Sequence, residues 1–284
     1  MSIIEKAVAR LSKPGAKPGA HRVSSSPNTG NSSSYSNAHD KPVCHFDVEA
    51  LREAGYLTSA EENSQFAEEY RLIKRPLLAN AFGKGAAPVA QGNLIMVTST
   101  VPGEGKTFTA MNLALSIALE RDTTVLLIDG DVINPQLSRL LAVNNEPGLM
   151  NVLDNPSVKL GDVIINTDVP KLRIMSSGNS SVHGTELLAS DEMARVTREL
   201  SERYPDRVVI FDAPPFLNTT QARVLAGYTG QVMMVVEAGS TNKNAIIEAT
   251  SQLDKSKVIG LILNKSKVTN KGFYGGYFGS YGGE

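Results

Sequence analysis

The sequence predicts an α/β fold, in which a mostly parallel central sheet is flanked by helices. Three observations support this. Short apolar runs alternate with helical stretches from residue 93 onward, a glycine-rich loop joins the first run to a helix, and aspartates end two later runs. The runs expected to be buried strands are 94–98, 124–129, 172–175, 207–212, 231–236 and 257–264, and the main helical stretches are 107–121, 185–203 and 241–254.

The composition is that of a globular chain without a strong overall charge. The 284 residues are 41% hydrophobic and carry a formal net charge of -1, so no global basic field draws the chain to nucleic acid. The single cysteine, Cys44, excludes an intramolecular disulfide, and Cys44 with His45 is too small a ligand set for a metal site. No apolar run is long enough to span a membrane, and the first residues do not resemble a signal peptide. We therefore expect a cytoplasmic protein.

The first 42 residues are expected to lie outside the folded domain, which we assign to residues 43–266. Residues 1–12 predict a short amphipathic helix, which either packs on its own domain or docks on a partner. Residues 13–42 are rich in Pro, Gly, Ser and Asn, as is typical of a disordered linker. The apolar face of the short helix is formed by Ile3, Ile4, Ala7, Val8 and Leu11.

A further amphipathic helix is predicted over residues 61–80. We expect Pro76 to kink or end it, because proline lacks the backbone N–H that a helix interior requires. Glu68, Arg71 and Lys74 lie together on a second face, where Glu68 and Arg71 have the spacing of an intrahelical ion pair. The apolar stripe consists of Phe66, Tyr70, Ile73 and Leu77.

The loop after the first predicted strand has the features of a phosphate-binding loop. It reads "TSTVPGEGKT" over residues 98–107, and its glycines allow a tight turn whose amides approach an anion at a helix N-terminus. Lys106 would reach the β- and γ-phosphates of a nucleotide, and the Thr107 hydroxyl would bind Mg²⁺. Thr100 occupies the position of the first glycine of the usual pattern, which is a departure. The nucleotide-binding residues predicted here are Pro102, Gly103, Glu104, Gly105, Lys106, Thr107 and Phe108.

Three aspartates are placed to act beside this loop. Asp129 and Asp131 follow the second run in "LLIDGD", and Asp212 ends a later run in "VVIFDAPP". Ligands of open parallel sheets bind beyond the carboxyl ends of the strands, so these carboxylates should converge on the loop. The combination predicts phosphoryl transfer or hydrolysis, for which the three aspartates would bind Mg²⁺ and activate the nucleophile, with one of them as the base.

The motifs together resemble the bacterial tyrosine kinases (BY-kinases). "TSTVPGEGKT", "VLLIDGDV" and "VVIFDAPP" are similar to the Walker A, A′ and B motifs of that family, and "EEYRLIKRPLLANA" is similar to its ring-forming helix. The resemblance covers roughly residues 55–284. It implies a P-loop NTPase fold of the MinD/ParA-like branch, ATP and Mg²⁺ as cofactors, and control of exopolysaccharide or capsule synthesis and export. It also implies a membrane chain-length-determinant or activator protein as partner, which would recruit the chain to the inner face of the membrane.

The resemblance also implies roles for individual residues. Asp129 would be the base toward a tyrosine hydroxyl, Asp131 would support the Mg²⁺ shell, and Asp212 would orient a metal-bound water. Glu68, Arg71 and Lys74 would contact a neighbouring subunit in a ring-type homo-oligomer. The sequence departs from many family members after "DGDV", where Ile133 and Asn134 stand in place of arginine.

The C-terminal residues 267–284 predict a flexible tail. The tail carries three tyrosines among glycines, Tyr274, Tyr277 and Tyr281, which the resemblance implies are the phosphate acceptors. Fifteen flexible residues have a root-mean-square reach of roughly 20 Å and an extended limit of about 50 Å, which suffices to enter a neighbour's site. Three alternatives remain open at this point: an ATPase switch of the MinD/ParA type without kinase activity, an assembly module that holds ATP as a structural ligand, and an aromatic tail that stacks on nucleic acid.

Overall fold

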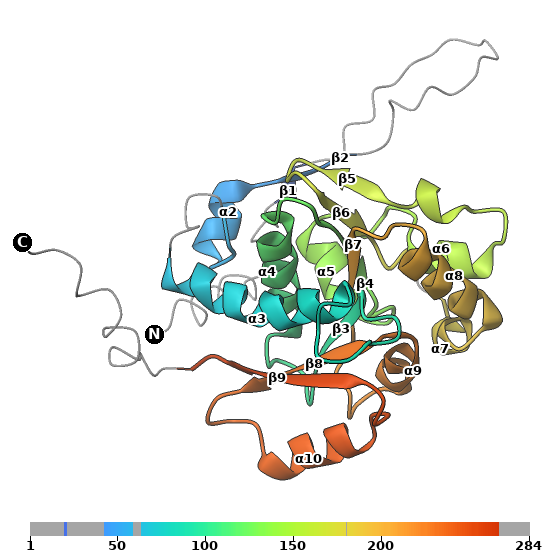
Figure 1. Ribbon diagram of the computed structural model, residues 1–284. Coiled ribbons are helices and arrows are strands. Elements are labelled where there is room, and N and C mark those ends of the chain that lie inside the picture. Colours follow the sequence, from blue (N-terminus) through green and yellow to red (C-terminus); the bar gives the residue numbers. More distant parts are fainter. Residues whose placement is uncertain (1–19, 22–42, 59–63, 180, 267–284) are drawn as a thin grey trace, which may run out of the picture.

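The structure is a computed structural model that describes residues 20–21, 43–58, 64–179 and 181–266. The predicted helix over 1–12, most of the predicted linker and the tyrosine tail lie outside the described residues. The described part is a central sheet with helices on both faces (Figure 1).

The sheet has nine strands in the order β1-β2-β5-β6-β4-β7-β3-β8-β9. The six strands from β6 to β9 run parallel, while β5 is antiparallel to β6, and β1 is antiparallel to β2. The strands are β1 (Ala20–His21), β2 (Val43–Phe46), β3 (Leu94–Ser99), β4 (Thr124–Asp129), β5 (Ile165–Thr167), β6 (Leu172–Met175), β7 (Arg207–Asp212), β8 (Gln231–Glu237) and β9 (Val258–Asn264).

Two hydrophobic clusters lie on the two faces of the sheet. The first is covered by α2 (Val48–Glu53), α3 (Gln65–Ala81), α4 (Lys106–Ala118) and α5 (Gln136–Leu140). The second is covered by α6 (Leu149–Asp154), α7 (Gly184–Leu188), α8 (Asp191–Glu202), α9 (Thr220–Tyr228) and α10 (Lys243–Ser251). The central strands have apolar contacts on both sides, which explains why their sequences are continuous apolar runs rather than alternating ones.

The predicted parallel strands are all present, but the prediction that all of them are buried is wrong for β9. This strand lies at the edge of the sheet and alternates between half-buried and exposed residues, with Leu261 56% and Leu263 64% exposed. The predicted helix over 185–203 is divided into α7 and α8. Strands β2 and β5 were not predicted, since each is too short to show a pattern, and β1 lies inside the region expected to be linker.

Helix α3 keeps its predicted apolar stripe and ends within one residue of its predicted end at residue 80. Tyr70 and Leu77 are buried, and Phe66 and Ile73 pack against the first cluster. The helix continues through Pro76 to Ala81, so Pro76 does not end it. Ser64 caps the helix by accepting a hydrogen bond from the backbone of Ala67.

The three charged residues predicted to share an exposed face of α3 are separated by the structure. Arg71 lies 2.8 Å from Glu68, in the i,i+3 ion pair that the sequence allowed. Lys74 is instead buried, with 5% of its surface exposed, and its ammonium donates to the Ser116 carbonyl at 2.6 Å and lies 2.7 Å from a Glu120 carboxylate oxygen. The structure therefore places Lys74 as a link between α3 and α4 and not on the exposed face with Glu68 and Arg71.

This placement predicts that Lys74→Ala lowers the free energy of unfolding by about 1.5–3 kcal/mol, because a buried carbonyl loses a charged donor. Arg75 is exposed on the same helix and provides the control, so Arg75→Ala should change stability by less than about 0.5 kcal/mol. Urea denaturation followed by circular dichroism measures both values. Equal stabilities for the two variants would contradict the structural role of Lys74.

Candidate active site

The sheet register brings the predicted site residues to one edge. Asp129 and Asp212 are paired residues at the ends of the neighbouring strands β4 and β7, and β3 lies on the other side of β7. The loop after β3 leads into α4, so the phosphate-binding loop begins beside both carboxylates. Parallel strands thus place side chains that are over a hundred positions apart in the sequence next to one another.

Two glycines give the loop its shape. Gly103 and Gly105 have φ angles of 90° and 96°, in the left-handed region that favours glycine. A side chain on Gly105 would also clash with the end of the Asn264 side chain, which would have to move from its position beside the loop. Helix α4 starts at Lys106 directly after this turn, which leaves its first amides available for an anion.

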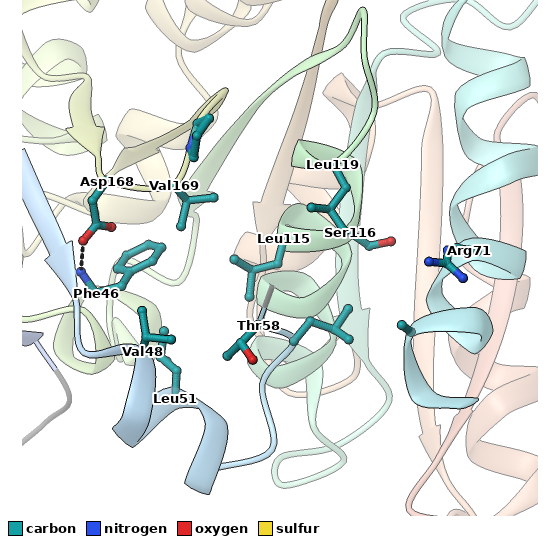
Figure 2. Close-up of a pocket in the computed structure, with 13 residues that line it drawn as sticks. Phe46, Val48, Leu51, Thr58, Arg71, Leu115, Ser116, Leu119, Asp168 and Val169 are labelled. Atoms are coloured by element: carbon teal, nitrogen blue, oxygen red, sulfur yellow. Dashed lines mark hydrogen bonds between the residues drawn. The ribbon is translucent and has the colours of Figure 1, made fainter. Parts of the chain in front are cut away.

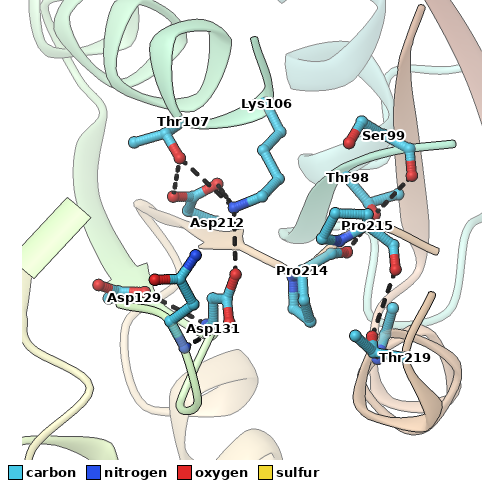
Figure 3. Close-up of polar contacts among 12 residues, drawn as sticks. Thr98, Ser99, Lys106, Thr107, Asp129, Asp131, Asp212, Pro214, Pro215 and Thr219 are labelled. Carbon is cyan, nitrogen blue, oxygen red and sulfur yellow. Dashed lines mark hydrogen bonds and ion pairs between the residues drawn. The ribbon is translucent and has the colours of Figure 1, made fainter. Parts of the chain in front are cut away.

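Lys106 and Thr107 face the carboxylates at the start of α4 (Figure 3). The Lys106 ammonium lies 3.4 Å from Asp131 and 3.7 Å from Asp212, and the Thr107 hydroxyl donates to Asp212 at 2.7 Å. Burial alone would lower the pKa of Lys106, but the surrounding carboxylates of Asp212, Asp131 and Asp129 outweigh burial and raise it. Lys106 therefore stays charged, as a phosphate-binding lysine must.

Asp129 is fully buried, as Asp212 is, and several hydrogen bonds hold its carboxylate. One of its oxygens accepts hydrogen bonds from the backbone and the hydroxyl of Ser138 in α5, each at 2.7 Å, and the other accepts from the Asp131 backbone. Burial and then the charge of Asp212 raise the pKa of Asp129 to about 7, although the Ser138 hydrogen bonds lower it. A carboxyl group with such a pKa is suited to accept a proton near neutral pH.

Asp212 and Asp131 present oxygens toward Lys106. Burial raises the pKa of Asp212, although Lys106 and Thr107 lower it. Its Oδ1 atom is buried without a hydrogen-bond partner among the described residues, which fits a site for a cation. No group of three or more Asp, Glu, His or Cys side chains in the described part of the chain is arranged to hold a metal ion by itself. Mg²⁺ does not require one, since it binds through one or two carboxylates together with water and phosphate oxygens.

Glu104 stabilises the phosphate-binding loop from its buried side. Its contacts also explain why Thr100 stands where the usual phosphate-binding pattern has its first glycine. The Glu104 carboxylate is buried and accepts hydrogen bonds from the Thr100 hydroxyl at 2.8 Å and from the Val101 backbone at 2.9 Å. It also accepts one from Thr241, in the loop between β8 and α10. Thr100 thus supplies a hydroxyl that a glycine would lack.

The end of β9 is attached to the phosphate-binding loop. Asn264 donates to the Glu104 carbonyl at 2.9 Å, and Lys265 donates to the Gly103 carbonyl at 2.7 Å while pairing with Glu237 at 2.8 Å. Strand β9 therefore ends at the catalytic edge, beside the phosphate-binding loop. The tyrosines themselves, Tyr274, Tyr277 and Tyr281, lie outside the described residues.

The remaining predicted residues divide between the loop and the core. Pro102 is exposed on the loop, whereas the Phe108 ring packs against Tyr56 and Phe66, with ring centroids 5.0 and 6.1 Å away. The Phe108 side chain therefore belongs to the core, and only its backbone lies near the loop. In the loop after β4, Ile133 is exposed and Asn134 accepts a hydrogen bond from Arg139. Arg139 therefore supplies a basic group next to the two positions at which many family members have arginine.

Sequence reasoning missed four residues at this site: Ser138, Thr241, Asn264 and Lys265. Asn264 and Lys265 could have been found, because they end an apolar run as the aspartates do and so had to reach the same edge. Ser138 and Thr241 lie in segments with no distinguishing pattern, and only the folded chain brings them to Asp129 and Glu104.

Comparison with known proteins places the chain among characterised families. Residues 92–258, more than half of the chain, match the family model of an AAA domain. The chain is 31% identical over 226 residues to the tyrosine-protein kinase YwqD of Bacillus subtilis, covering 79% of this chain and 91% of that protein. It is 32% identical to the tyrosine-protein kinase ptk of Acinetobacter johnsonii, covering 65% of this chain but only 25% of that longer protein.

Among solved structures, the chimerical protein CapA2B2 is similar in both fold and sequence. The two share 26% identity with a TM-score of 0.62, over 74% of this chain and 92% of that one. The predicted P-loop α/β fold is confirmed by this likeness together with the loop, the strand order and the family model. The identity to YwqD extends over nearly all of that kinase, and the chain is therefore a member of the bacterial tyrosine-protein kinase family.

Proposed function

We propose that this tyrosine kinase is an autokinase, which transfers the γ-phosphate of ATP to Tyr274, Tyr277 and Tyr281 of a neighbouring copy. The observation that carries the proposal is the attachment of the end of β9 to the phosphate-binding loop through Asn264 and Lys265. Tyr274 follows Lys265 by nine residues, which span at most about 30 Å when extended. Tyr274 would thus lie within reach of the phosphate-binding loop of its own chain, and the longer reach of the whole tail, about 50 Å, would let it enter the site of a neighbouring copy.

The residues at the sheet edge would have different roles in phosphoryl transfer. Lys106 and the amides of the loop would bind the phosphates and stabilise the charge that develops on them. Thr107, Asp131 and Asp212 would hold Mg²⁺, which supplies further neutralisation of the phosphate charge when it is bound. Asp129 would accept the proton of the attacking tyrosine hydroxyl.

We propose that the kinase acts in exopolysaccharide or capsule synthesis and export, as its resemblance to the BY-kinases implies. No helix in the described ranges is long and apolar enough to cross a membrane. A membrane chain-length-determinant or activator protein would accordingly recruit the chain from the cytoplasm to the inner face of the membrane. The exposed pair of Glu68 and Arg71 on α3 would contribute to a ring-type homo-oligomer.

We expect Lys106→Met to abolish phosphorylation of the tail, because the phosphates lose the buried cation beside them. The rate should fall by at least roughly 10²-fold. Mass spectrometry of residues 267–284 after incubation with ATP and Mg²⁺ measures this, with circular dichroism to confirm folding. The exposed Lys255 provides the control, and Lys255→Met should retain full activity. ATP hydrolysis by the unaltered chain without any phosphotyrosine would favour the ATPase alternative.

We expect Asp129→Asn to lower turnover by roughly 10²–10⁴-fold while ATP affinity stays close to that of the unaltered chain, because a base acts mainly on the transition state. Single-turnover phosphorylation and ATP titration separate the two quantities. Asp131→Asn is the matched comparison, since Asp131 faces Lys106 and should affect ATP and Mg²⁺ binding. If Asp131→Asn lowers turnover alone and Asp129→Asn lowers ATP affinity, the two roles are reversed.

We expect phosphate transfer between chains in a mixture of two variants. One is Lys106→Met with an intact tail, and the other is an active chain whose three tail tyrosines are replaced by Phe. Phosphotyrosine should appear on the Lys106→Met chain. Labelling of the unaltered protein at a rate independent of dilution, with the Lys106→Met chain unlabelled, would show transfer within one chain.

The same mixture tests the contact on α3. Replacing both Glu68 and Arg71 with Ala should reduce transfer between chains and give smaller species by light scattering. The pair of Glu192 and Arg195 on α8 has the same i,i+3 spacing, with its charged atoms 2.6 Å apart, and is the matched control. Equal masses for the two double variants would contradict a role for α3 in assembly.

A further inference from the structure

An apolar groove lies on the first face of the sheet, away from the phosphate site (Figure 2). It has a volume of about 460 Å³. Leu115 and Leu119 line it from the end of α4 opposite the phosphate-binding loop, roughly 20 Å along the helix from Lys106. The other lining residues used below are Phe46, Val48, Ser116 and Asp168.

The groove is suited to an apolar occupant. Val48 and Leu119 at its rim are 54% and 49% exposed, which is unusual for aliphatic side chains beside one cavity. Most of its polar groups already have partners: the Asp168 carboxylate accepts the Phe46 backbone N–H at 3.0 Å, and the Ser116 carbonyl accepts from Lys74. The Thr58 hydroxyl is the one buried side-chain polar atom of the lining that has no hydrogen-bond partner among the described residues. A polar small molecule would therefore find few groups to bind, whereas aliphatic side chains would cover the exposed rim.

The pairing of β1 with β2 shows which segment of the chain lies near. Ala20 is paired with Phe46, a residue of the groove, and the antiparallel direction means that the chain preceding residue 20 leaves at this end of β2. Nine residue steps separate Leu11 from Ala20, which corresponds to a root-mean-square distance of roughly 17 Å and an extended limit of about 30 Å. The first eleven residues are thus tethered close to the groove.

We propose that residues 3–11 bind in this groove of their own chain as an amphipathic helix. The face formed by Ile3, Ile4, Ala7, Val8 and Leu11 supplies the aliphatic side chains that the groove lacks. A helix this short is marginal in isolation, so burial of its apolar face would stabilise it. The short connection to β1 favours the groove of the same chain over that of a second copy.

Cross-linking in the full chain tests the proposal directly, because the native cysteine does not interfere. Cys44 is buried, and burial followed by the charge of Asp168 raises its pKa to about 12, so the reactive thiolate is disfavoured. Cysteines introduced at Val8 and Val48 should be joined within one chain by a short bismaleimide. Ile247 on α10 is also 54% exposed but lies on the other face, so the pair Val8→Cys with Ile247→Cys is the matched control.

We expect positions 8 and 48 to be cross-linked at least roughly tenfold faster than positions 8 and 247. A segment bound in the groove would hold the two cysteines close together, which raises the effective concentration of one near the other. Mixing isotopically light and heavy chains distinguishes links within one chain from links between copies. Equal rates for the two pairs would overturn the proposal, as would links that form mainly between copies.

A second variant tests whether the groove itself holds the segment. Leu119→Asp places a charge at the exposed rim of the groove and leaves the buried core intact. It should reduce the rate of cross-linking between positions 8 and 48 to that of the control pair. Ile247→Asp, a charge at a similarly exposed aliphatic position, should leave that cross-link unchanged. An undiminished cross-link in a folded Leu119→Asp chain would overturn the proposal. None of these changes touches the phosphate site, so the outcome is independent of kinase activity.

Discussion

The structure of the catalytic edge depends on the balance between one buried ammonium group and the carboxylates around it. Asp129, Asp131 and Asp212 lie almost without solvent at the ends of neighbouring strands, and the repulsion among them is offset by Lys106. Buried charges are tolerated only when they are paired and hydrogen-bonded. The loop must therefore hold Lys106 where it does, and the two left-handed glycines make that position possible. Phosphates and Mg²⁺ would enter a site whose charges already compensate one another.

Much of this fold could be predicted from the sequence because its central strands are buried on both faces. Continuous apolar runs mark such strands clearly, and the rule that ligands bind at the carboxyl ends of parallel strands then placed the three aspartates and the loop together. The edge strands were less visible. Strand β2 is only four residues long, and β9 alternates in exposure although its sequence is apolar throughout, because nothing in the described chain covers its outer face.

Side-chain partners were the part of the site that the sequence could not supply. Lys74 has the helical spacing of the buried stripe, four residues after Tyr70 and three before Leu77, but that spacing does not reveal its partners. The position of α4 makes it a buried link to Ser116 and Glu120. The two Ser138 hydrogen bonds to Asp129 depend on where α5 begins, which is decided by tertiary packing rather than by local propensity. Pairs so distant along the chain leave no periodic signal in a single sequence.

The internal carboxylate of Glu104 has a thermodynamic consequence for nucleotide recognition. The Glu104 carboxylate binds Thr100 and Val101 at the start of the phosphate-binding loop and Thr241 in the loop after β8. These hydrogen bonds hold the two loops together within the protein itself. A binding site that is already ordered loses little conformational entropy when its ligand arrives, and this preorganisation appears directly in the affinity. Glu104 would thus affect the affinity for ATP, whereas the residues that face the phosphates would determine the rate of phosphoryl transfer.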